Sequence, residues 1–139
     1  MDKCLFCKII KKEMNAKIIY EDDMTMCILD INPISDAHCI VMPKKHFEYF
    51  SNCDDDYLSA VAKTTKKIAN VINSSSLGND GINYLVNEKA NANQEIMHLH
   101  MHIIPKFKKE EGFHVSVKRN NKKTIDETYE VLVHQLFSN

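Results

Sequence analysis

The stretch that most constrains the fold is HLHMHIIP, His98 to Pro105, in which a histidine stands at every second position. Alternate side chains of a β-strand point to opposite faces of its sheet. As a strand, this segment would place its three histidines on one face and Leu99, Met101 and Ile103 on the other, against a core. The pattern therefore predicts a strand whose polar face lines a functional site.

Three imidazoles on one face of a strand have two chemical interpretations besides chance. Histidines two positions apart can converge on one zinc ion if their rings tilt inward. Alternatively, one neutral imidazole attacks phosphorus while its neighbours fix its tautomer and hold the anionic group under attack. His100 has a histidine on each side and is the natural nucleophile. Spacing alone does not decide between the two.

Hydrophobic periodicity over the rest of the chain predicts an antiparallel α+β domain, because strands outnumber helices and neighbours connect by short turns. The clearest helix runs over about 54–72, where apolar residues recur at three- and four-residue spacing. The other expected elements are a short helix over 5–11 and strands over 17–22, 24–30, 38–43, 81–87 and 98–105.

The C-terminal segment, residues 106–139, carries no diagnostic motif. It is basic and irregular up to Lys123. A last helix is expected to start near Thr124, because T-I-D-E has the form of a capping box. We expect this helix to bury the apolar stripe Ile125, Tyr129, Leu132, Val133 and Leu136.

Length and composition are those of a globular protein with one domain over residues 1–139, 44% hydrophobic and 27% charged. A formal net charge of −1 gives no reason to expect nucleic acid or a membrane surface as the main partner. The first residues lack the apolar core of a signal peptide, and no run of 18 apolar residues occurs. We therefore expect a cytoplasmic protein with reduced cysteines.

Cys4 and Cys7 form a Cys-x-x-Cys pair, which has the spacing of metal ligands. A metal would need two further ligands. A thioredoxin-like redox pair would need a βαβ context, which the pattern of elements lacks. Two merely buried cysteines remain as the third interpretation.

Taken together, several segments resemble the histidine triad (HIT) family, whose signature is H-φ-H-φ-H-φ-φ with φ apolar. The segments that match, in the family's order over residues 4–105, are C-L-F-C-K-I-I, Y-E-D-D, I-L-D-I-N-P, H-C-I-V-M-P-K-K-H, an N-x6-Q and H-L-H-M-H-I-I. The Cys-x-x-Cys form is similar to bacterial members of the Hint-like branch. The resemblance implies a HIT-like fold, with a mainly antiparallel sheet of about five strands, one long helix and a C-terminal helix. It also implies a homodimer that joins two sheets into one.

The resemblance further implies a hydrolase that cleaves purine nucleoside phosphoramidates or related nucleotide conjugates through a covalent nucleotidyl-histidine. His100 would match the nucleophile, and His102 would contact the phosphate or the leaving group. His98 would support the site, and His38 would lie behind the triad. The alternatives are a dinucleoside-polyphosphate hydrolase and a weakly active nucleotide-binding or interaction module. A nucleotidyltransferase is disfavoured, because such relatives resemble H-x-H-x-Q and this chain has His102.

For the nucleotide, the resemblance implies that Asp30 binds the ribose hydroxyls and that Ile31 packs against the base. Asn87 and Gln94 resemble the amides on the phosphate side, beside His100 and His102. On their own, these polar residues are more typical of turns and loop caps, as Asp30 is before Asn-Pro.

For the metal, resemblance to zinc-bearing members implies that His46 and His98 complete a Cys2His2 site with Cys4 and Cys7. That zinc would be structural, with no open position. The chain departs from the family at Ala37, Lys89 and Asn93, where many members carry glycine. Asparagine tolerates the left-handed conformation better than most residues, so the bend is expected to survive at Asn93.

Overall fold

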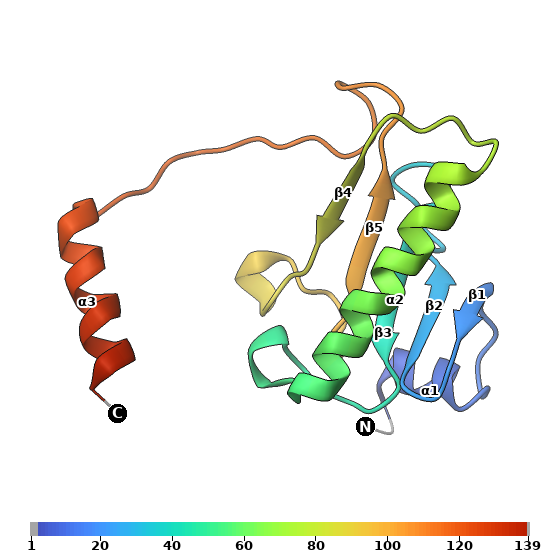
Figure 1. Cartoon of the computed structure of the whole chain (residues 1–139), viewed down its shortest axis with the longest axis horizontal. Helices are drawn as coiled ribbons and strands as arrows, with labels where there is room; N and C mark the ends of the chain where they lie inside the picture. The colour runs from blue at the N-terminus through green and yellow to red at the C-terminus, as the bar shows by residue number, and fades with distance from the viewer. Residues whose placement is uncertain (1–2, 139) are drawn as a thin grey trace.

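A five-stranded antiparallel sheet forms the body of the protein in the computed structural model, which describes residues 3–138 (Figure 1). The spatial order is β1-β2-β3-β5-β4, so β5 lies between β3 and β4. This confirms the predicted α+β class and five-stranded sheet. The strands are β1 (Ile18–Glu21), β2 (Thr25–Leu29), β3 (Cys39–Pro43), β4 (Ile82–Leu85) and β5 (Met101–Pro105).

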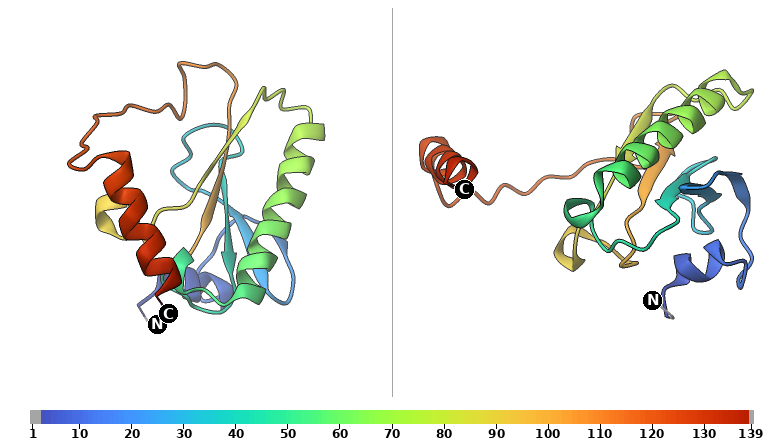
Figure 2. Two further views of the ribbon diagram at one scale, coloured as in Figure 1. Left: turned by 60° about the vertical axis from the view of Figure 1, so that its left-hand side comes forward. Right: turned by 60° about the horizontal axis from the view of Figure 1, so that its bottom comes forward.

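The central strands are buried on both faces, because one helix covers each face of the sheet (Figures 1 and 2). On one face, α2 (Asp55–Ser74) packs Val61, Ile68 and Ile72 against residues of β2, β3 and β5. On the other, α1 (Leu5–Ile10) packs Phe6 and Ile9 against the alternate residues of β2 and β3. Two 3-10 turns complete the body, η1 (Phe50–Asn52) and η2 (Ala90–Ala92). Within residues 3–138, no helix is long and apolar enough to cross a membrane.

The histidine strand is shorter than expected, because β5 begins at Met101 rather than at His98. The β3–β5 register pairs Val41 with Met101, so a longer ladder would pair Met42 with His100 and then Pro43 with Leu99. Proline has no N–H to donate to a ladder, which ends the regular pairing there. Leu99 and Ile103 are buried as predicted, and Met101 is half-buried. Only His102 of the triad therefore lies within the regular strand.

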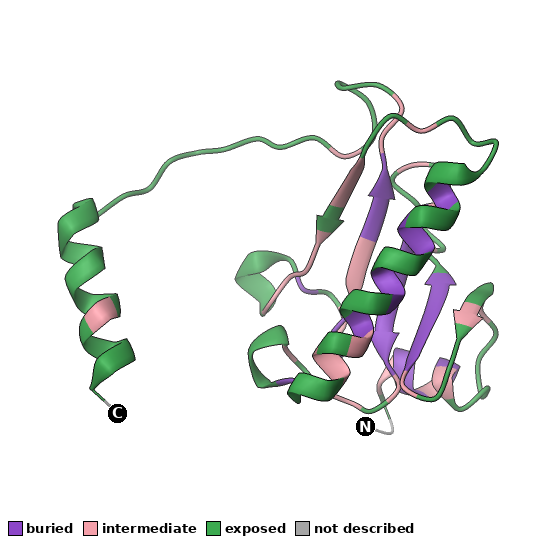
Figure 3. Ribbon diagram, viewed as in Figure 1, coloured by how far each residue is buried: buried purple, intermediate pink, exposed green. Residues whose placement is uncertain are grey.

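The C-terminal helix forms, but its apolar stripe is not buried as predicted. α3 (Ile125–Phe137) starts with the expected capping box, in which Thr124 and Glu127 exchange two hydrogen bonds of 3.1 Å. The arm of residues 114–124 carries the helix away from the body (Figure 3), and apart from a half-buried Val133 its residues are exposed. Capping is decided locally, whereas burial needs a tertiary partner, and the described chain does not supply one.

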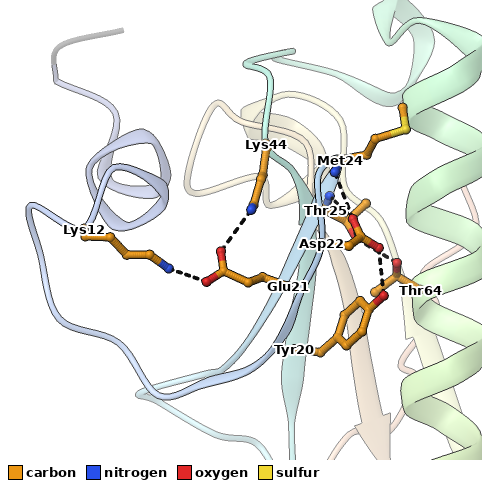
Figure 4. Close-up of polar contacts among 8 residues, drawn as sticks. All are labelled: Lys12, Tyr20, Glu21, Asp22, Met24, Thr25, Lys44 and Thr64. Carbon is orange, nitrogen blue, oxygen red and sulfur yellow. Dashed lines mark hydrogen bonds and ion pairs between the residues drawn. The ribbon is translucent and has the colours of Figure 1, made fainter.

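A network around the β1–β2 turn joins the sheet to α2 (Figure 4). Asp22 Oδ1 accepts from the backbone N–H groups of Met24 and Thr25, both at 2.9 Å, and Tyr20 donates its hydroxyl to Oδ2. The buried hydroxyls of Thr25 and Thr64 then join β2 to α2 at 2.7 Å. Burial alone would raise the pKa of Asp22, but these hydrogen bonds outweigh it and lower that pKa.

Three residues outside the glycines hold a left-handed backbone at positions where the family resemblance led us to expect glycine. The φ angles are 66° at Ala37, 73° at Lys89 and 68° at Asn93. The bend expected at Asn93 is therefore present. Lys89 is the most unusual, because its ψ of 165° places it in a region that glycine alone occupies freely. The loop holds it there through a 2.7 Å hydrogen bond from the Lys89 N–H to Gln94 Oε1.

Replacing Asp22 with asparagine should lower the free energy of unfolding by about 0.5–1 kcal/mol at pH 7, because a carboxylate accepts these hydrogen bonds more strongly than an amide. The folded pKa lies below the unfolded one, so the carboxylate's contribution is present above about pH 4 and is lost as the pH falls through the folded pKa. Urea unfolding of both proteins between pH 7 and pH 3 measures the difference in their free energies of unfolding. Asp23→Asn in the same turn is the control. A difference that stays constant down to pH 3 would contradict the stabilising role of the Asp22 carboxylate.

Lys89→Gly should raise the free energy of unfolding by about 1 kcal/mol. Strain of about 1–3 kcal/mol is relieved, while the freer unfolded glycine costs about 0.5–1 kcal/mol. Lys89→Ala is the matched control, because it keeps the Cβ atom and removes the ammonium that lies 5.5 Å from the Tyr49 ring. Urea titration of the three proteins tests this, and a glycine variant no more stable than the alanine variant would show that the backbone is unstrained.

Candidate functional site

Four predicted metal ligands converge at one end of the sheet. Cys4 precedes α1, Cys7 lies within it, His46 follows β3 and His98 precedes β5. Their four ligand atoms all lie within 4.8 Å of one another. A hollow of about 380 Å³, lined in part by Cys4, His46, Glu48 and Glu95, adjoins the cluster. These residues could form a metal site.

The spacing of the donor atoms fits a tetrahedral ion. Zinc bonds of about 2.0–2.1 Å to nitrogen and 2.3 Å to sulfur imply tetrahedron edges of about 3.3 Å between nitrogens and about 3.5 Å between nitrogen and sulfur. The two histidine Nδ1 atoms lie 3.1 Å apart. His98 Nδ1 lies 3.5 Å and 3.6 Å from the sulfurs of Cys4 and Cys7, and His46 Nδ1 lies 3.3 Å from that of Cys7. The donor set and its geometry both suit the ion.

The supporting contacts of His98 fix which ring nitrogen faces the sulfurs. Its Nε2 lies 2.8 Å from the carbonyl of Pro43, which can only accept, so Nε2 carries the proton. Complete burial lowers the pKa of His98 to about 4, which keeps the ring neutral. Nδ1 therefore presents a lone pair to the cluster. A histidine ligand held by a backbone carbonyl in this way is the usual arrangement in metal sites.

Burial, together with the neighbouring Cys4, raises the pKa of Cys7 to about 11. A thiolate at this position therefore needs a cation beside it. This electrostatic requirement agrees with the ligand geometry.

His100 lies beside the metal cluster with one ring nitrogen engaged. Its Nδ1 lies 2.8 Å from the main-chain carbonyl of His98, so Nδ1 donates and Nε2 keeps its lone pair. The ring is almost fully buried, and its centroid lies 5.0 Å from that of Phe6 in an edge-on contact. Burial lowers the pKa of His100, although the bond to the His98 carbonyl opposes this. The arrangement favours a neutral imidazole with a free nitrogen.

A second chain of hydrogen bonds sets the tautomer of His102. The Ile34 N–H donates to His38 Nδ1 at 3.1 Å, so the proton of neutral His38 lies on Nε2. That N–H points at His102 Nδ1, 2.9 Å away. His102 therefore keeps its own proton on Nε2. His100 and His102 are neighbours, with ring centroids 4.9 Å apart, and differ in that one offers a lone pair and the other an N–H.

The same hydrogen bonds argue against a second metal at the cluster of Asp30, His38 and His102. Their donor atoms also lie within 4.8 Å of one another. Ligation by His38 Nε2 would need a lone pair on that atom, and hence a proton on Nδ1. Nδ1 already faces the N–H of Ile34, so that proton would meet another donor. The cluster of Cys4, Cys7, His46 and His98 therefore suits a metal ion, whereas hydrogen bonds orient the histidines in the cluster of Asp30, His38 and His102.

The predicted nucleotide contacts lie around this second cluster or on the loop beside β4. Asp30 is half-buried; its Oδ2 lies 3.6 Å from His38 Nε2, while Oδ1 accepts from the Asn32 N–H at 2.8 Å. It thus makes the turn that its sequence context suggested and also faces the histidines. Ile31 is 84% exposed. Asn87 donates its side-chain amide to the carbonyl of Asn93 at 3.2 Å.

Gln94 is engaged differently from the phosphate contact expected of it. Its Nε2 donates to the carbonyls of Glu48 at 2.7 Å and Ile96 at 3.1 Å, and its Oε1 accepts from Lys89. Both amide hydrogens are therefore used, and no donor remains for a phosphate in this arrangement. Glu48 and Ile96 each stand two residues from a candidate metal ligand, so Gln94 joins the segments that carry His46 and His98.

Sequence reasoning missed the backbone groups that orient the histidines, namely the Ile34 N–H and the carbonyls of Pro43 and His98. No side-chain pattern signals a main-chain partner, so only the three-dimensional structure could find them.

Comparison with known proteins identifies the family of the chain. A model of the HIT domain matches residues 11–109. An uncharacterized HIT-like protein of Borreliella burgdorferi is 43% identical over 100% of this chain and 99% of its own. The adenosine 5'-monophosphoramidase of Candida albicans is 40% identical over 74% of this chain and 70% of its own.

Among solved structures, a HIT family protein from Bacillus anthracis matches with a TM-score of 0.88 at 29% identity, covering 99% of this chain and 98% of its own. The match of the family model spans most of the sequence and includes all three histidines of the triad. The chain therefore belongs to the HIT domain family.

Proposed function

We propose that the protein is a nucleotide hydrolase that cleaves purine nucleoside phosphoramidates or related nucleotide conjugates. The proposal rests on the opposite tautomers of two neighbouring histidines: His100 has a lone pair on Nε2, and His102 has an N–H on Nε2. Covalent catalysis at phosphorus needs a nucleophile with a free electron pair and a nearby donor for the charge that moves away from it. The similarity to a monophosphoramidase supports the substrate class.

In the first step, His100 Nε2 attacks the α-phosphorus, and the bond from phosphorus to the leaving nitrogen breaks. The imidazole becomes cationic, and the hydrogen bond from His100 Nδ1 to the His98 carbonyl stabilises that charge. His102 Nε2–H donates a hydrogen bond to a phosphoryl oxygen or to the leaving group and keeps its proton, while the departing nitrogen takes up a proton from solvent. The products of this step are an amine and a nucleotidyl-histidine.

In the second step, water attacks phosphorus and the bond to His100 Nε2 breaks. The attacking water releases a proton to solvent, the nucleoside monophosphate leaves, and His100 returns to its neutral form. His38 keeps the proton of His102 on Nε2 through both steps, because the Ile34 N–H holds the opposite side of the His38 ring. His38 is therefore a positioning residue in this scheme.

For substrate binding, Asp30 is proposed to accept from the ribose hydroxyls, because Oδ2 carries charge and lies beside the histidines. Ile31 offers an exposed apolar side chain for the base. Asn87 remains a candidate phosphate contact from the loop that follows β4. Gln94 would act indirectly, by holding that loop and the segment before β5.

Zinc is the proposed occupant of the cluster formed by Cys4, Cys7, His46 and His98, because the donor set is Cys2His2 and the edges fit a tetrahedron. All four positions would be taken by protein, so zinc would supply structure and no bond to substrate. It would fasten α1 to the segment before β5. A homodimer is proposed as the assembly, on the family resemblance.

His100→Ala should lower the rate of adenosine 5'-phosphoramidate hydrolysis by at least about a thousandfold, because the variant has no nucleophile. Release of AMP by the purified protein is the measurement. His114→Ala in the exposed arm is the matched control and should keep the full rate. An unmodified protein without turnover would favour a binding module, and activity that survives in the His100 variant would refute the mechanism.

Freshly purified protein should carry close to one zinc per chain, measured by elemental analysis. Cys4→Ala removes one of four ligands and should weaken zinc binding at least about a hundredfold. Chelation should lower the midpoint of thermal unfolding, because α1 loses its link to His98. Cys53→Ser, a thiol outside the cluster, is the control and should keep its zinc. Zinc retained at full occupancy by the Cys4 variant would place the ion elsewhere.

A further inference from the structure

Cys4 is the cysteine of this chain that solvent reaches most easily. It is half-buried and borders the hollow of about 380 Å³, whereas the other four cysteines are buried. Cys27 and Cys39, in the core of the sheet, are 0% exposed. A small oxidant in solvent would therefore meet Cys4 before any other thiol. The proposed hydrolysis gives this exposure no role.

Cys4 and Cys7 are already arranged for a bond between their sulfurs. Cys4 is the N-cap of α1, and its ψ of 119° lies outside the helical range. Its Sγ accepts from the Cys7 N–H at 3.4 Å, so the side chain turns back over the first turn of the helix. The two sulfurs lie 3.5 Å and 3.6 Å from one nitrogen of His98 and within 4.8 Å of each other. Because one turn of α1 carries both residues, their closure to the disulfide length of about 2.05 Å requires no movement of one element past another.

A metal ion and a disulfide cannot share these sulfurs. Zinc bonds of about 2.3 Å hold two thiolates about 3.8 Å apart in a tetrahedron, which is nearly twice the length of a disulfide. The ion also engages the electron pairs with which a thiolate attacks an oxidant. After oxidation only His46 and His98 remain as ligands, which leaves a tetrahedron half empty. Each state therefore excludes the other.

We propose that Cys4 and Cys7 are a site of oxidative modification, at which hydrogen peroxide closes a disulfide in the metal-free protein and thereby shuts the cluster to metal. Formation of the disulfide is independent of the proposed hydrolysis. The exclusion of metal rests on the proposed zinc site.

The modification proceeds in two balanced steps. In the first, Cys4 Sγ attacks one oxygen of the peroxide and the O–O bond breaks. Sulfur is oxidised to a sulfenic acid, and the other oxygen leaves as water with the proton of the thiol. In the second, Cys7 Sγ attacks Cys4 Sγ, the S–S bond forms and the S–O bond breaks. The departing hydroxide takes up the Cys7 proton, so two thiols and one peroxide give one disulfide and two waters.

The modification changes how α1 is held against the triad. In the reduced, metal-loaded protein the ion would fasten α1 to His98, whose carbonyl accepts from His100 Nδ1. The disulfide removes that link. It leaves the ring of Phe6, which lies edge-on to those of His98 and His100, as the remaining contact of α1 with these two histidines. Added zinc should therefore stabilise the reduced protein and not the oxidised one.

The first experiment treats full-length protein, freed of metal by a chelator, with a small excess of hydrogen peroxide. We expect the chain to lose two of its five free thiols and two hydrogens in mass. Peptide mapping should join Cys4 to Cys7, and dithiothreitol should reverse the change. Protein preloaded with zinc should keep all five thiols. Cys7→Ser should form no disulfide within the chain, whereas Cys53→Ser, the matched control, should still lose two thiols.

The second experiment measures thermal unfolding with and without zinc. Zinc should raise the Tm of the reduced protein by about 5 °C or more and leave that of the oxidised protein unchanged. Circular dichroism before oxidation checks that each sample is folded.

The outcomes separate the parts of the proposal. Five free thiols after peroxide, or a disulfide between other cysteines, would overturn the modification site. A disulfide that forms as fast in zinc-loaded protein, or an oxidised protein that zinc stabilises, would overturn the exclusion. A reduced protein that zinc does not stabilise would refute the zinc site and the exclusion together, while the thiol count still decides the disulfide. None of these measurements involves nucleotide turnover, so failure of the proposed hydrolysis is seen separately in the release of AMP.

Discussion

His98 is the residue on which the remaining site geometry depends. Its Nε2–H donates to the Pro43 carbonyl, which leaves Nδ1 facing the sulfurs of Cys4 and Cys7. Its own carbonyl accepts from His100 Nδ1 and so leaves the other nitrogen of that ring free. One fully buried residue therefore orients both the candidate metal site and the candidate nucleophile. A rotation of its ring or its peptide would disturb both together.

The end of a strand ladder makes this double use possible. Pro43 cannot donate to a neighbouring strand, but its carbonyl remains available to His98. Because β5 becomes regular only at Met101, the two preceding histidines are released from strict alternation. His98 faces the cysteines, while His100 takes a separate place beside Phe6. The sheet holds His102 more conventionally, at a register position opposite Ile40.

Much of the fold was predictable because its signals are local. The β1–β2 hairpin, α2 and the capping box of α3 follow from residues close together in sequence, and all were confirmed. The strand starting at His98 was wrong by three residues, because the ladder with β3 ends at Val41 and Met101, and the pairing of distant strands is a long-range property. Burial of the α3 stripe was wrong for a related reason, since amphipathicity indicates that a helix needs a partner but not where the partner lies. Gln94 was assigned by resemblance to the phosphate, while its contacts in the structure are with backbone groups.

The sequence by itself determined which chemical groups are present: two thiols at ligand spacing, three alternating imidazoles, and an amphipathic last helix. The resemblance indicated the bend at Asn93, and the structure holds left-handed backbone at Ala37 and Lys89 as well. Only the tertiary structure decided what each imidazole can do. The deciding contacts join residues as far apart as His98 and Pro43, or His102 and His38. A histidine's chemistry depends on which nitrogen carries the proton, and the partner that fixes this comes from another strand or loop.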